Sequence, residues 1–125
     1  MAPDPRDLLP LKPFVFQALV VLSDGELHGW GLLRAIETRT GARVLPGQLY
    51  RQLEAMLDQR LVEERRPPRG SPREERATNT GVAAPRRFFR LTPFGRRVAQ
   101  AEARRLAGLV DELRSKGLLT DRGRS

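Results

Sequence analysis

The run Pro46-Gly47-Gln48-Leu49-Tyr50-Arg51 combines side chains that could read nucleic acid. Glutamine can pair with the edge of an adenine, and arginine can donate two parallel hydrogen bonds to a guanine or a phosphate. We therefore expect Gln48 and Arg51 to contact bases, with Gly47 allowing close backbone approach and the Tyr50 hydroxyl facing a phosphate. An ordinary amphipathic helix with a polar outer face would carry the same residues, so this run alone does not establish nucleic-acid binding.

A second group of candidates lies in the basic segment from Arg65 to Arg90, which holds eight arginines against two glutamates. Contacts from arginine to phosphate bring affinity and register without reading sequence, and they weaken as salt rises. We expect such contacts from Arg73, Arg76, Arg86 and Arg87. The alternative is a solvated basic loop that contacts nothing. The formal net charge of the whole chain, +8, favours an acidic partner, with nucleic acid first.

Residues for catalysis or metal binding are scarce. There is one histidine, His28, and there are no cysteines, so we expect no metal site, no cofactor and no enzymatic activity. Glu63-Glu64 and Glu74-Glu75 are adjacent pairs, which would not converge as a carboxylate dyad. Trp30, the only tryptophan, could stack on a small ligand, although at helical spacing a core role is the more common one.

The candidate residues lie on a predicted series of helices and strands. Apolar periodicity predicts helices over 12–22, 28–40 and 46–60, then a strand over 61–64. A loop rich in proline, glycine and arginine follows, and residues 86–91 (RRFFRL) have the character of a returning strand. Thr92-Pro93 is a helix start, with threonine as the cap and proline as the first helical residue. A last helix is expected to end near Lys116.

This last helix has a stripe of apolar residues that recur after four, three, four and three positions. Such spacing is typical of a helix that packs along another helix. We therefore expect dimerisation through Ala99, Ala103, Leu106, Val110 and Leu113.

The expected architecture is mainly α with a small β-hairpin: a winged helix-turn-helix with an added C-terminal dimerisation helix. The predicted parts are a loose N-terminal arm (1–10), a DNA-binding domain (11–92) with its wing at about 61–92, the dimerisation helix (93–116) and a loose tail (117–125). At 125 residues the chain has room for one domain with an appended helix. The N-terminus carries no signal-peptide pattern and no apolar run could cross a membrane, so we expect a cytoplasmic protein.

Three motifs in this order resemble the PadR family of bacterial transcriptional regulators. They are His28-Gly29-Trp30 at the start of the second helix, Pro46-Gly47 with Tyr50 at the start of the third, and Phe88-Phe89 leading into Leu91-Thr92 and Gly95. The chain departs from the family pattern at Trp30, where tyrosine is usual, and at Leu45, where a serine cap is common. Its wing insertion also looks longer than usual.

The resemblance implies a homodimer of the short subgroup, with a single helix after the wing, that binds a palindromic operator, usually as a repressor. Some members release DNA when a small molecule binds, so an effector is possible here. Our first hypothesis is therefore a dimeric transcriptional repressor on double-stranded DNA. The alternative is a winged-helix module for protein–protein contact, whose basic wing docks on an acidic partner.

Overall fold

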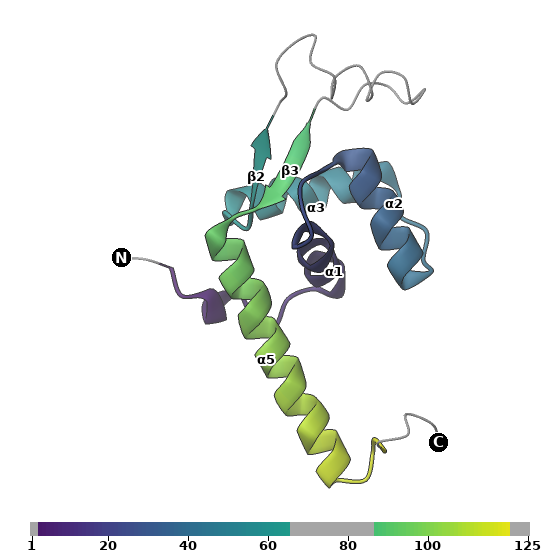
Figure 1. The fold of residues 1–125 in the computed structure, drawn as a ribbon, viewed down its shortest axis with the longest axis vertical. Coiled ribbons are helices and arrows are strands. Elements are labelled where there is room, and N and C mark those ends of the chain that lie inside the picture. Colours follow the sequence, from purple (N-terminus) through teal and green to yellow (C-terminus); the bar gives the residue numbers. More distant parts are fainter. Residues whose placement is uncertain (1–2, 66–86, 121–125) are drawn as a thin grey trace.

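The computed structural model describes residues 3–65 and 87–120 (Figure 1). Within these ranges the chain forms helices and a small antiparallel sheet, so the predicted fold class is confirmed. In chain order the elements are the 3-10 helix η1 (Pro5–Leu8), α1 (Pro13–Leu22), β1 (Leu27–His28), α2 (Gly29–Thr40), α3 (Pro46–Asp58), β2 (Val62–Arg65), β3 (Phe88–Leu91) and α5 (Pro93–Ser115).

Local sequence signals set the helix boundaries. Proline occupies the first turn of α1, α3 and α5, where its missing N–H costs no hydrogen bond. The Thr92 hydroxyl accepts a hydrogen bond from the Gly95 N–H at 2.8 Å, and His28 Nδ1 accepts one from the Gly31 N–H at 2.9 Å. At the end of α2, Gly41 adopts a left-handed conformation with φ 71°. His28 is thus the N-terminal cap of α2 and directly precedes its first residue, Gly29.

The sheet contains one strand that the sequence did not predict. Its order is β1-β3-β2, and both pairings are antiparallel. β1 is only two residues long, too short for an alternating pattern, and it exists because Leu27 and His28 pair with Phe89 and Phe88.

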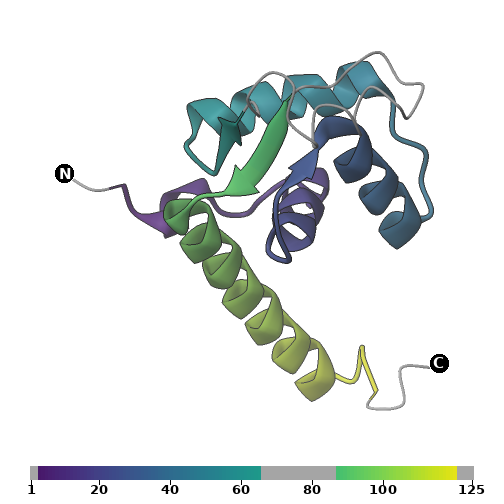
Figure 2. The same cartoon turned by 45° about the horizontal axis from the view of Figure 1, so that its top comes forward.

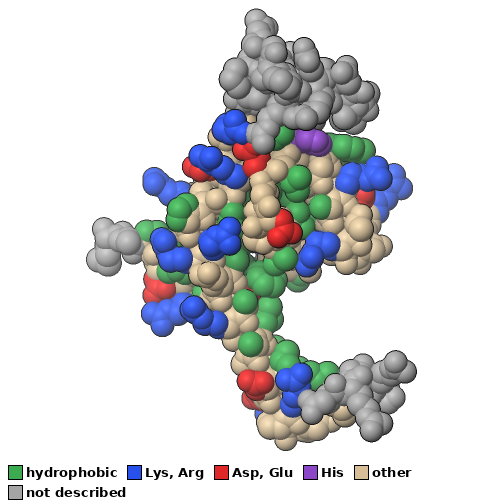
Figure 3. Space-filling view, viewed as in Figure 1, with side chains coloured by type: hydrophobic (Ala, Val, Ile, Leu, Met, Phe, Trp, Pro, Cys, Tyr) green, Lys and Arg blue, Asp and Glu red, His purple; other side chains and the backbone are tan. Residues whose placement is uncertain are grey.

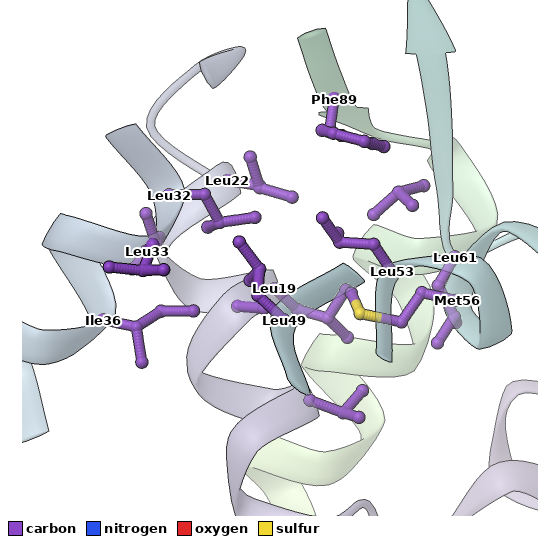
Figure 4. Close-up of a cluster of buried hydrophobic side chains, with 14 of the residues drawn as sticks. Leu19, Leu22, Leu32, Leu33, Ile36, Leu49, Leu53, Met56, Leu61 and Phe89 are labelled. Atoms are coloured by element: carbon purple, nitrogen blue, oxygen red, sulfur yellow. The ribbon is translucent and has the colours of Figure 1, made fainter. Parts of the chain in front are cut away.

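The core is built mainly from leucine and valine, as the low aromatic content requires (Figure 4). Each leucine that is fully buried stabilises the fold by about 2 kcal/mol. The three helices of the helix-turn-helix supply most of it, and β3 and α5 close it with Phe89 and Val98, both fully buried. The labelled cluster comprises Leu19, Leu22, Leu32, Leu33, Ile36, Leu49, Leu53, Met56, Leu61 and Phe89.

One junction joins α3, the sheet and α5. The carbonyl oxygen of Leu61 accepts a hydrogen bond from the backbone N–H of Thr92 at 3.1 Å. The Thr92 hydroxyl donates mainly to the Arg60 carbonyl at 2.6 Å and lies 3.1 Å from the Leu61 carbonyl. The same oxygen lies against Gly95, where an added Cβ would come within 2.0 Å of it. The Leu-Thr-x-x-Gly motif is therefore a structural device, in which threonine caps α5 and glycine lets the helix approach the strand.

The N-terminal arm, predicted to be loose, instead has ordered structure. Pro5–Leu8 forms η1, which packs against α5. The Leu11 N–H donates a hydrogen bond to the carboxylate of Glu102 at 2.8 Å, and Glu102 is only 2% exposed. Composition gave no sign of this anchor, because the partner lies on the last helix.

The long helix α5 leaves the body of the molecule at an angle (Figures 1 and 2). Its buried residues, Gly95, Val98 and Glu102, all lie in its first half. The second half has no buried residue, and Leu109 is 41% exposed. Just after the helix, within the predicted loose tail, Leu118 N–H bonds back to the Leu113 carbonyl at 2.9 Å.

The packing at the Leu61 carbonyl predicts that two glycines of α5 differ in how their substitution changes stability. Gly95→Ala should destabilise the fold by about 1–3 kcal/mol, because the methyl group would overlap the Leu61 carbonyl. Gly108→Ala is the matched control, since nothing lies within 4 Å of its added Cβ. It should stabilise the helix by up to about 1 kcal/mol. Urea unfolding of both variants measures the difference, and equal shifts of the midpoint would contradict this account of the junction.

Candidate nucleic-acid interface

The third helix divides its side chains between core and solvent. Leu49, Leu53 and Met56 are fully buried, whereas Gln48 and Arg51 are exposed in its first turns. Figure 2 shows α3 lying across the top of the molecule in that view. The two residues expected to read bases therefore share the outward side of one helix. An added Cβ at Gly47 would meet nothing within 4 Å, so the protein's own packing does not require this glycine.

Tyr50 is half-buried rather than free. An added Cβ at Gly29 would lie 2.3 Å from its hydroxyl oxygen, so a larger residue at position 29 would require the Tyr50 ring to shift. The glycine of the His-Gly-aromatic motif and the tyrosine of the Pro-Gly-x-x-Tyr motif are thus two sides of one contact. Contact between the hydroxyl and a phosphate stays a prediction.

Arg87 links α3 to the sheet. Its guanidinium donates to Glu64 on β2 through Nε and Nη2, both at 2.9 Å, and to Glu54 on α3 at 2.8 Å. The same group lies over the rings of Tyr50, at 5.7 Å, and Phe89, at 5.2 Å. Hydrogen bonding to Glu64 raises the pKa of Arg87 above its usual range. Arg87 is thus paired with two glutamates of its own chain, and its predicted contact with a phosphate stays a prediction.

The other arginines of the strands are also paired. Arg65 forms an ion pair with Glu26, and Arg90 forms one with Glu63 at 2.5 Å. Positive charge at the base of the wing is therefore largely balanced by nearby carboxylates. The predicted phosphate contacts of Arg73, Arg76 and Arg86 lie outside the described residues.

His28 and Trp30 flank the interface at the start of α2. His28 packs edge-on against Phe88, with ring centroids 5.8 Å apart, and burial lowers its pKa. The imidazole thus stays neutral at neutral pH, as its acceptor role at the cap requires. Trp30 is half-buried against the core, and the guanidinium of Arg34 lies 5.9 Å from its ring centroid. A ligand role for Trp30 stays a prediction.

The apolar stripe of α5 is accessible along most of its length. Ala99 contacts the core, Ala103 is exposed, and Leu106, Val110 and Leu113 are half-buried. Between them sits Glu102, which sequence reasoning missed. The hydrogen bond from Arg105 lowers the pKa of Glu102, although burial opposes it. In the sequence, only the position of Glu102 between residues of the apolar stripe could have indicated that it is buried.

The described residues contain no cluster of histidine or acidic side chains that could hold a metal ion. No helix among them is both long and apolar enough to cross a membrane.

A three-helix core, a strand pair leading to a basic wing and an exposed polar helix define a winged-helix DNA-binding fold. The family model described as "Transcriptional regulator PadR-like family" matches residues 18–101. The chain therefore belongs to the PadR-like family, a family of transcriptional regulators rather than enzymes.

Individual relatives agree with this placement. An uncharacterized 37.1 kDa protein in transposon TN4556 of Streptomyces fradiae is 36% identical over 91 residues, which are 73% of this chain. The match spans only 22% of the length of that relative.

Two solved structures show the same fold. RosR from H. salinarum has a TM-score of 0.59 and 22% identity, over 86% of this chain and 81% of that one. F93 from STIV, described as a winged-helix DNA-binding protein, has a TM-score of 0.55 and 16% identity, over 78% and 88%.

Arg87, which precedes β3, and Arg90 within it should differ sharply in their contribution to stability. Arg87→Ala removes the guanidinium that bridges Glu64 on β2 and Glu54 on α3 and should cost about 1–3 kcal/mol. Arg90→Ala removes an ion pair whose members are 53% and 48% exposed, so it should cost less than about 1 kcal/mol. Thermal or urea unfolding distinguishes them. If the two variants were equally stable, Arg87 would not be the link between helix and sheet.

Proposed function

We propose that the protein is a sequence-specific transcriptional repressor that binds a palindromic operator as a homodimer. The observation that carries the proposal is the exposed first half of α3, where Gln48 and Arg51 share the outward side of a helix whose other side is locked into the core. Because its partner would be chromosomal DNA, it would act in the cytoplasm.

Gln48 and Arg51 would enter the major groove and contact base edges, with Gly47 letting the backbone approach the DNA. Tyr50 and Arg87 would act by holding α3 against α2 and the wing. Arg73, Arg76 and Arg86 would contact phosphates beside the groove. A protein–protein role for the same surface is the competing explanation, and DNA binding distinguishes the two.

Dimerisation would bury the second half of α5. Its apolar residues are only half-buried or are exposed in the described single chain, and their spacing suits a second copy of the same helix. Two recognition helices related by a twofold axis would then face two half-sites of an inverted repeat.

DNA binding should depend on α3 and fall with salt. Arg51→Ala should weaken binding to the operator by about 1–3 kcal/mol. Arg39→Ala is the charge-matched control, since Arg39 lies at the far end of α2 and donates a hydrogen bond to Gln17. The affinity of this variant for the operator should stay near that of the wild type. Gel shifts over a salt series measure both. Changes in the wing could abolish function while alanine at Gln48, Arg51 and Gln52 leaves it intact. That result would favour the protein-docking alternative.

The dimer interface can be tested on α5 alone. Val110→Glu places a charge within the stripe and should convert the dimer to a monomer. Gly108→Glu adds the same charge two residues earlier, about 200° around the helix, and should leave the dimer intact. Light scattering after gel filtration reports the mass of each. A wild-type monomer at micromolar concentration, or a dimer that survives Val110→Glu, would overturn this part of the proposal.

A further inference from the structure

A groove of about 620 Å³ lies between the N-terminal segment and the first half of α5. Its half-buried residues are mainly apolar and include Leu9 and Ala101. Positive charge dominates the rest, because four arginines and one aspartate line the groove: Arg6, Arg97, Arg104, Arg105 and Asp4. Figure 3 shows basic side chains gathered where the N-terminal segment meets the upper part of α5.

Within residues 3–65 and 87–120, two of these arginines form no ion pair. Arg6 pairs with Asp4 at 3.0 Å, and Arg105 pairs with Glu102. Arg97 has only the ring of Phe94, at 5.9 Å, while Arg104 has no ion pair or side-chain hydrogen bond among the described residues. Guanidinium groups bind carboxylates and phosphates through two parallel hydrogen bonds. The groove thus offers two free oxyanion donors beside apolar surface.

We propose that this groove binds a small amphiphilic anion. A carboxylate or phosphate group would be held by Arg97 and Arg104, and an attached apolar chain would lie against Leu9 and Ala101. The volume of the groove falls within the range of about 300–1,000 Å³ that is usual for small-molecule sites.

The groove is also held in shape and remains open in the proposed dimer. Glu102, bonded to the Leu11 N–H, ties the segment that forms one wall to the helix that forms the other. Arg97, Ala101 and Arg104 follow at intervals of four and three and share one face of α5. Leu106 of the apolar stripe lies about 200° around the helix from Arg104. A second copy packed on the stripe would leave the groove exposed.

Octanoate is a suitable probe, with octanamide as its neutral counterpart and acetate as the anion without an apolar chain. Isothermal titration of the full chain without DNA should show octanoate binding at least about tenfold more tightly than either control. The double variant Arg97→Ala with Arg104→Ala should lose this preference. Arg96→Ala, an exposed arginine on the same helix outside the groove, should retain it.

Equal binding of octanoate and octanamide would overturn the proposal, as would equal binding of octanoate and acetate. Octanoate affinity unchanged in the double variant would place the anion elsewhere and overturn it too. The titration contains no DNA, so its failure would leave the proposed DNA-binding function untouched. A chemical-shift map with labelled protein gives a second readout, in which octanoate should perturb amides around Leu9 and Ala101.

Discussion

The position of α3 depends on the packing around one ring, that of Tyr50. Gly29 brings α2 against its hydroxyl end, and the guanidinium of Arg87 covers its face while binding Glu54 and Glu64. Three elements, α2, α3 and the wing strands, are thereby held around a single side chain. Leu49, Leu53 and Met56 bury the inner side of α3. Together with the contacts of Tyr50, they make Gln48 and Arg51 face outward.

The Leu61 junction extends the same rigidity to α5. Thr92 donates from its backbone N–H to the Leu61 carbonyl and from its hydroxyl mainly to the Arg60 carbonyl, and the Leu61 oxygen lies against Gly95. The last helix therefore starts at a fixed point beside the end of α3. A dimer built on α5 would therefore hold two copies of α3 at a defined separation. That separation sets the spacing between half-sites in a palindromic operator.

Sequence reasoning predicted the elements that local signals control. Apolar periodicity and the Thr92-Pro93 start signal marked the helices to within about two residues. It missed what depends on distant partners. β1 exists only through pairing with β3, and η1 is ordered through contacts with α5. The pairing of Arg87 with Glu64 and Glu54 could not be predicted, because these glutamates lie 23 and 33 residues away in the sequence.

The central claim is that the first turns of α3 read base sequence. Selection of bound sequences from a random DNA pool tests it most directly, using the wild type and Gln48→Ala in parallel. The account predicts an inverted repeat for the wild type. For the variant it predicts relaxed preference at one symmetric pair of positions, with the rest of the repeat kept. A wild type that enriches no sequence, or a variant that enriches the identical repeat, would contradict it.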